Sequence, residues 1–136
     1  MQDINGLSVA GSGSIYAKSN IATTDLRLDI AGSGSIIIPE LKTNTTRSSI
    51  AGSGSIEISG KEKMEKHKID IAGSGDIKAK DIPTSLVEID IAGSGNCYLN
   101  VIDKIKASIA GSGDIYYYGR PSIESSTAGS GKIKPL

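Results

Sequence analysis

The sequence lacks tryptophan and phenylalanine, and its five aromatic residues are all tyrosines. Aromatic rings usually supply much of the volume of a globular core, so this core must be filled by other side chains. A single cysteine, Cys97, excludes an intrachain disulfide framework. The 15 basic and 15 acidic residues cancel, whereas nucleic-acid binders and polybasic membrane binders carry an excess of positive charge. We therefore expect no nucleic-acid partner.

Long apolar runs are also missing. No run approaches the roughly 18 residues that a membrane-spanning helix needs, so we expect no membrane span. Residues 1–6 carry neither the basic region nor the apolar region of a signal peptide. Such a start is expected of a cytosolic protein or of a chain from which a leader has been removed.

One tetrapeptide, Ala-Gly-Ser-Gly, occurs seven times along the chain. Its copies begin at Ala10, Ala31, Ala51, Ala72, Ala92, Ala110 and Ala128. Successive copies are 21, 20, 21, 20, 18 and 18 residues apart. A helical repeat needs two helices and usually about 33 residues or more, whereas a period near 20 suits one coil of a β-helix. The repeat therefore predicts a solenoid whose coils each turn at an Ala-Gly-Ser-Gly corner.

The residues beside each corner alternate between apolar and polar, which is the period of a half-buried strand. The second residue after each motif is, in order, Ile15, Ile36, Ile56, Ile77, Cys97, Ile115 and Ile133. A short third side is indicated by Ile21, Leu41 and Ile82, each ten residues before the next motif. We predict an all-β, single-stranded parallel β-helix of about seven coils, forming a single domain over residues 1–136. Right-handed coiling is expected because crossovers between parallel strands are almost always right-handed.

The repeated glycines do not match a known ligand loop. No copy has the third glycine or the following helix of a dinucleotide site, and Ile133 follows Lys132 where a P-loop needs Ser or Thr. Calcium β-rolls place Asp in every turn. The residue after each corner here is instead Ser14, Ser35, Ser55, Asp76, Asn96, Asp114 or Lys132. We predict no cofactor and no metal, and we interpret the glycines as corner residues that need positive φ or close contact between coils.

Catalytic residue types are scarce as well. His67 is the single histidine and takes a slot that other coils fill with Leu26 or Val87. Cys97 replaces Ile in the inward ladder and is interpreted as a small buried hydrophobe. Neither a zinc site nor a Cys-His pair has enough members, and no paired acidic residues recur on one flank. We expect a protein that is not an enzyme, with a carbohydrate-active β-helix enzyme as a distant alternative.

Three tyrosines form the candidate surface site. Tyr98 and Tyr116 occupy equivalent outward positions of neighbouring coils, and Tyr118 lies on the same side of its strand as Tyr116. Such a patch could stack on a sugar ring or anchor a protein contact. The alternative interpretation is ordinary cross-strand pairing that shields the backbone near one end of the rod.

Several coils resemble a known family. The stretch Ile-Asp-Ile-Ala-Gly-Ser-Gly-Asp-Ile at residues 69–77, and the C-terminal stretch at residues 111–121 with the last corner, resemble repeats of the head GIN domain family of auto-transporter adhesins. The resemblance implies a right-handed parallel β-helix in bacterial envelope or secreted proteins and offers no catalytic residues to transfer. Family members usually carry a leader and a further N-terminal β segment, whereas these repeats begin within ten residues.

Two functions follow as hypotheses. The first is a periplasmic, cell-surface or secreted adhesin-like module that binds a surface glycan or protein. The second is a structural envelope scaffold that self-associates as a homo-oligomer through its coil ends or an exposed face. Strand edges at a solenoid end template further pairing unless they are capped, and neither residues 1–6 nor residues 132–136 resemble a cap.

Overall fold

A computed structural model describes residues 6–17 and 21–135. Within these residues every regular element is a β-strand, and the pairing between strands is parallel throughout. The strands are β1 (Gly6–Gly11), β2 (Ser14–Tyr16), β3 (Ile21–Ala22), β4 (Asp25–Gly32), β5 (Ser35–Ile38), β6 (Leu41–Lys42), β7 (Thr45–Gly52), β8 (Ser55–Ser59), β9 (Met64–Gly73), β10 (Asp76–Gly93), β11 (Cys97–Gly111), β12 (Asp114–Tyr118), β13 (Ser122–Gly129) and β14 (Lys132–Pro135).

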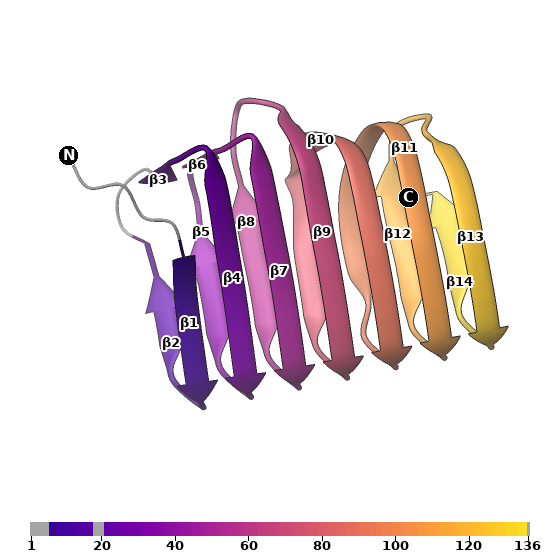
Figure 1. Ribbon diagram of the computed structural model, residues 1–136, viewed down its shortest axis with the longest axis horizontal. Coiled ribbons are helices and arrows are strands. Elements are labelled where there is room, and N and C mark those ends of the chain that lie inside the picture. Colours follow the sequence, from indigo (N-terminus) through magenta and orange to yellow (C-terminus); the bar gives the residue numbers. More distant parts are fainter. Residues whose placement is uncertain (1–5, 18–20, 136) are drawn as a thin grey trace.

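The strands form two parallel ladders that meet at the corners (Figure 1). The leading ladder holds the segments that run into a corner, namely β1, β4, β7, β9, the second halves of β10 and β11, and β13. The trailing ladder holds the segments that leave it, namely β2, β5, β8, the first parts of β10 and β11, β12 and β14. Seven corners thus bound six turns, and the predicted parallel β-solenoid is confirmed.

Each corner needs glycine at two positions. The first glycine has positive φ, from 94° at Gly11 to 132° at Gly93, a region that side chains other than glycine rarely adopt. The second lies directly over the preceding coil: a Cβ added to Gly75 would sit 2.6 Å from the carbonyl oxygen of Gly54. In later coils the first glycine also lies close to the preceding coil, since an added Cβ would sit 2.2–2.5 Å from a glycine carbonyl oxygen. Both predicted reasons for glycine are therefore confirmed.

Aliphatic ladders fill the interior. The residue before the corner is buried in coil after coil, and so is the second residue after it, because period-two alternation turns both inward. The fully buried set includes Ile36, Ile56, Ile77, Cys97 and Ile115. Stacked β-branched side chains thus replace the missing aromatics, and each coil buries its apolar side against its neighbours.

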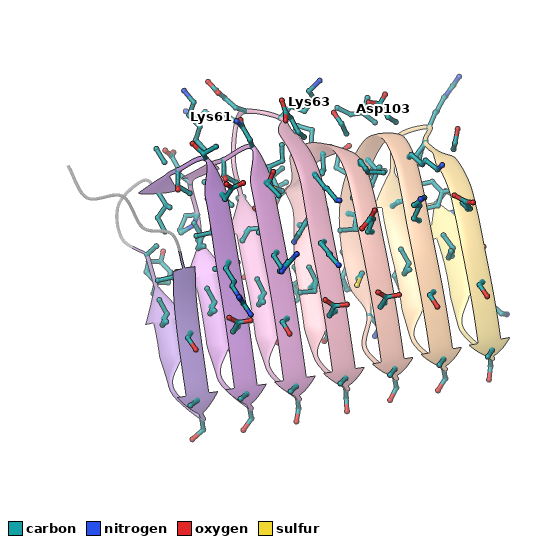
Figure 2. The ribbon with its side chains drawn as sticks, in the orientation of Figure 1. Lys61, Lys63 and Asp103 are labelled. Carbon is teal, nitrogen blue, oxygen red and sulfur yellow. The ribbon has the colours of Figure 1, made fainter. Side chains whose placement is uncertain are left out.

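The edge opposite the corners is the irregular one. In the first coils a short third side is present, where β3 pairs with β6 and buries Ile21 and Leu41. In later coils this side merges into the long strands β10 and β11, with register shifts between Ala79 and Pro83. Figure 2 shows Lys61, Lys63 and Asp103 along this edge. Changes in coil length are therefore absorbed away from the corners.

Candidate functional site

The tyrosine patch lies on the outer face of the trailing ladder. Strand alternation puts Tyr98 and Tyr116 outward, because their neighbours Cys97 and Ile115 are fully buried. The strands pair in register, so one outward row contains Tyr16, Ile37, Glu57, Lys78, Tyr98, Tyr116 and Lys134 in successive coils. The patch therefore consists of two adjacent tyrosines in this row, with Lys78 on one side and Lys134 on the other.

The rings of Tyr98 and Tyr116 stack. Their centroids are 5.2 Å apart and their planes are inclined by 12°, which lies within the range of favourable aromatic pairs. The predicted adjacency is confirmed, and both side chains are half-buried. Tyr118 is 45% exposed two residues along the same strand. Because Tyr116 covers one face of Tyr98, the other face of Tyr98 turns toward the coil that carries Lys78.

A ladder of side chains fixes the start of each tyrosine strand. The backbone N–H of Asn96 donates to Asp76 Oδ1 (3.1 Å), that of Asp114 to Asn96 Oδ1 (3.2 Å), and that of Lys132 to Asp114 Oδ1 (3.0 Å). The Tyr116 hydroxyl donates to Asp114 Oδ2 at 3.4 Å. Partial desolvation, and then the charge of Asp114, raise the pKa of Tyr116. The carboxylate and amide side chains after these corners therefore hold the backbone, and Asp114 also holds the Tyr116 hydroxyl.

A groove opens beside Tyr98. It has a volume of about 380 Å³ and is lined by Glu57, Lys78, Lys80, Asp81 and Tyr98. Its wall combines one aromatic side chain with two carboxylates and two ammonium groups, so it offers hydrogen-bond acceptors and donors around an apolar surface. The lining is thus mostly charged, and the ring of Tyr98 is its one aromatic surface.

The leading ladder carries charges instead of aromatics. Its ion pairs include Arg27–Asp29 (3.0 Å), Lys66–Glu88 (3.6 Å) and Lys104–Glu124 (3.1 Å). A larger cavity of about 610 Å³ lies there, lined by Thr23, Thr24, Asp25, Leu26, Arg27, Thr45 and Arg47. Desolvation, and then the neighbouring carboxylate of Asp70, raise the pKa of Asp90. Both cavities carry charges of both signs, but the cavity on this face has no aromatic residue among its lining residues, so we take the tyrosine groove as the candidate site.

His67 and Cys97 lie inside the solenoid. A hydrogen bond of 2.8 Å joins Ser48 Oγ to His67 Nε2, while Nδ1 has no partner among the described residues. Burial lowers the pKa of His67 to about 3 and raises that of the Cys97 thiol. Both side chains are 0% exposed. The predicted inward positions of both residues are therefore confirmed, and the hydrogen bond from His67 to Ser48 is an additional finding.

The sequence signal for the contact between Ser48 and His67 is the presence of polar residues, Thr46 and Ser48, at core positions. They occupy slots that the preceding coil fills with Leu26 and Leu28. Thr46 Oγ1 donates to the sulfur of Met64 at 3.0 Å. Three polar side chains at core positions of neighbouring coils indicate a shared internal contact, although periodicity alone does not say which atoms meet.

Residues 6–17 and 21–135 contain no group of three or more His, Cys, Asp or Glu side chains placed to hold a metal ion. The same residues form no helix with the length and apolarity to cross a membrane.

The fold and its outer row define a parallel β-solenoid with an aromatic surface patch. The chain belongs to the family described as "Putative auto-transporter adhesin, head GIN domain", whose pattern matches residues 1–121. This confirms the family expected from the repeats. Among curated proteins, none matches the sequence.

Solved structures of bacterial proteins share the fold. A "putative adhesin" from Parabacteroides distasonis ATCC 8503 superposes with a TM-score of 0.92 at 25% identity, over 98% of this chain and 56% of that one. A putative adhesin from Bacteroides fragilis NCTC 9343 has a TM-score of 0.89 and 28% identity, over 97% of this chain and 60% of that one. A "putative lipid binding protein" from Parabacteroides distasonis ATCC 8503 has a TM-score of 0.92 and 34% identity, over 98% of this chain and 55% of that one. This chain therefore spans a little over half the length of these proteins.

Proposed function

We propose that this chain is a non-enzymatic, adhesin-like binding module of the bacterial cell envelope or of a secreted protein, and that it binds a surface glycan at the tyrosine patch. The observation that carries the proposal is the stacked pair Tyr98–Tyr116 beside a charged groove. Membership of an adhesin family and the adhesin names of the structural neighbours support the general class. They also support a periplasmic, cell-surface or secreted location.

A glycan suits the chemistry of the groove. The face of Tyr98 that Tyr116 leaves uncovered can pack against the C–H face of a sugar ring, because aromatic faces carry partial negative charge. The carboxylates of Glu57 and Asp81 can accept hydrogen bonds from hydroxyls, and Lys78 and Lys80 can donate to ring or carboxylate oxygens. Tyr118, at the end of β12, extends the patch toward the edge opposite the corners.

The ligand is expected on the outer face. One neighbour is named for lipid binding, but the interior of this chain is occupied by side chains such as Ile56, Ile77 and Ile115, each 0% exposed. A ligand of any kind would therefore compete with packed aliphatic side chains inside, whereas the groove beside Tyr98 is already open to solvent.

A glycan array tests the proposal. The wild-type chain is compared with Tyr98→Ala and Tyr116→Ala, and with Tyr16→Ala, which removes a tyrosine from the same row in the first coil. We expect loss of binding for the first two variants and retention for the third. No glycan bound by the wild type, or equal binding by all four proteins, would refute the glycan proposal. Binding to protein only, in a pull-down that Tyr98→Ala abolishes, would identify a protein partner instead.

The same experiment tests the non-enzymatic assignment. Bound glycans are incubated with the protein and examined for cleavage products. We expect intact glycan. The groove does contain two carboxylates, Glu57 and Asp81, which is the number that a glycosidase uses, so this measurement decides between binding and cleavage. Release of products that is lost in Glu57→Gln or Asp81→Asn would identify the carbohydrate-active enzyme that was the distant alternative.

A second candidate function is a structural, self-associating scaffold. The observation that favours it is the exposure of the last coil, where all eight residues of β13 are exposed. Equivalent strands within the rod alternate between buried and exposed residues. A mass in solution that is independent of concentration and equal to that of one chain would exclude this candidate.

A further inference from the structure

The groove beside Tyr98 lies in the middle of the rod. Glu57 on β8, Lys78 on β10 and Tyr98 on β11 are register partners in three successive coils, and further described coils lie on both sides of them (Figure 1). One face of the Tyr98 ring is covered by Tyr116, and the opposite face turns toward the coil of Lys78. Lys78 is therefore the first charged residue of the row beside the free face of Tyr98, and Glu57 lies one coil farther away.

The charged side chains of the groove are not paired with one another. Elsewhere on the rod, lysines pair with glutamates of neighbouring coils at 3.1–3.6 Å. Glu57 and Lys78 lie directly opposite each other in the pairing of β8 with β10, yet they form no such pair. Within the described part of the chain, no ion pair or side-chain hydrogen bond involves the four charged residues of the groove, Glu57, Lys78, Lys80 and Asp81. The groove thus presents two ammonium groups and two carboxylates to a ligand.

The two lysines lie close together on one strand. Ala79 between them is 0% exposed, so period-two alternation turns Lys78 and Lys80 outward on the same face. Two residue steps of extended strand separate their Cα atoms by roughly 6.6 Å. Like charges at such a separation repel each other, and an anion bound between them relieves the repulsion. The oxygens of one carboxylate or sulfate group can accept hydrogen bonds from both ammonium groups.

The positions of the carboxylates favour hydroxyl groups as their partners. The coil of Lys78 separates Glu57 from Tyr98, and Asp81 lies beyond a register shift from Lys78. A carboxylate only accepts hydrogen bonds, so each of these two residues suits a donor such as a sugar hydroxyl. The substituents of a ring packed on Tyr98 therefore meet an ammonium group before they meet a carboxylate, and an acidic substituent suits that place.

We propose that the glycan bound at the tyrosine patch is acidic. A sugar ring packs against the free face of Tyr98, and its carboxylate or sulfate group accepts hydrogen bonds from Lys78 and Lys80. Glu57 and Asp81 accept hydrogen bonds from hydroxyls of the same glycan. Hydrogen bonds to an ionised acceptor are roughly twice as strong as those between neutral groups, so the acid group sets the specificity. The inference rests on the proposed glycan-binding function and narrows its ligand to an anionic class.

Matched acidic and neutral oligosaccharides test the ligand class. Uronic acid oligomers are compared with the same oligomers after reduction of their carboxyl groups to alcohols, and sulfated oligomers with the same oligomers before sulfation. We expect the wild-type chain to bind an acidic oligomer about tenfold or more tightly than its neutral counterpart, because the neutral form lacks the charge-assisted hydrogen bonds. Added salt should weaken the acidic complex and leave the neutral one unchanged. The two series distinguish a carboxylate from a sulfate as the acid group.

Substitutions at the lysines test the contact itself. Lys78→Gln and Lys80→Gln should each weaken binding of the acidic oligomer by about fivefold or more, and should leave binding of the neutral oligomer almost unchanged. The matched control is Lys106→Gln, which removes the same charge from an exposed position on the leading ladder. This control should bind the acidic oligomer like the wild type.

The outcomes separate the ligand class from the broader proposal. Equal binding of acidic and neutral oligomers that is lost in Tyr98→Ala would overturn the acidic ligand and leave the glycan-binding function intact. Binding of acidic oligomers that Lys106→Gln weakens as much as Lys78→Gln and Lys80→Gln would also overturn it, because the interaction would then be a general attraction to lysines. Failure of every oligosaccharide to bind, acidic or neutral, would overturn both the acidic ligand and the glycan-binding function.

Discussion

The buried pair Ser48–His67 makes the stability of this rod depend on pH. His67 is 0% exposed and burial lowers its pKa from 6.5 to about 3, because the charged imidazolium cannot be solvated inside the core. The unfolded chain binds a proton at His67 near pH 6.5, whereas the folded chain does not until about pH 3. Stability is therefore full above pH 6.5 and falls as pH decreases toward 3.

The magnitude follows from the size of the shift. A difference of about 3.5 pKa units, at 1.36 kcal/mol per unit, corresponds to roughly 5 kcal/mol between pH 6.5 and 3. Between pH 7 and pH 4 the share lost is about 3 kcal/mol by the same arithmetic. That loss is a large part of the stability of an ordinary domain.

The test replaces the pair with apolar residues. In the double variant His67→Val and Ser48→Ala, the histidine slot takes the residue that Val87 supplies in the next coil. Guanidinium unfolding at about pH 7 and pH 4 should show that the wild type loses about 3 kcal/mol more than the variant. Exposed carboxylates titrate in both proteins, so their contribution cancels in the comparison.

Two results would refute the reasoning. One is an equal loss of stability in wild type and double variant between the two pH values. The other is a histidine titration, followed by NMR in the folded wild type, with a midpoint near 6.5. At pH 7 the double variant should be as stable as the wild type or more so, because it removes the unpartnered Nδ1, whereas Ser48→Ala alone should lose about 1–3 kcal/mol.

Three other outcomes are expected. Gly113→Ala should lower the unfolding free energy by about 1–3 kcal/mol or more, because its Cβ would meet a backbone carbonyl of the preceding coil. The control is Gly13→Ala, at the equivalent position of the first corner, where an added Cβ meets no described heavy atom within 4 Å. This control should leave thermal unfolding unchanged. Cys97 should resist Ellman's reagent in the native protein and react on unfolding, since it is buried and its thiol pKa is raised; rapid native labelling would contradict the packed interior. Asn96→Ala should cost about 1 kcal/mol in denaturant unfolding by removing the acceptor of the Asp114 N–H, and an unchanged midpoint would show that the side-chain ladder does not stabilise the rod.

The ladders could be predicted from the sequence because coils stack in register. Once the corners were aligned, the partners of each residue followed, including the adjacency of Tyr98 and Tyr116. The reason is geometric: a parallel ladder repeats at every coil, so equal positions from a corner become neighbours.

Contacts that depend on rotamers or irregular register could not be predicted in this way. The hydrogen bond between Ser48 and His67 depends on side-chain torsions that periodicity leaves open. The groove beside Tyr98 includes Asp81, which lies past a register shift between Lys78 and Asp81 in the pairing of β10 with β8. Such shifts arise where coil lengths differ, and a repeat pattern carries no information about how the extra residues are accommodated.

The outward row of the trailing ladder places side chains at regular intervals along the rod. Its positions recur at about 4.8 Å, the spacing between neighbouring strands, and Ile37 and Glu57 occupy the same kind of position as Tyr98 and Tyr116. Exchanging the pair Ile37 and Glu57 with the pair Tyr98 and Tyr116 would move the stacked tyrosines by three coils. At that spacing the move is about 14 Å along the rod, and the backbone beneath would stay the same. The solenoid thus separates where a surface group stands from how the chain folds, and a protein with this architecture can change the spacing of its contacts by editing one row of side chains.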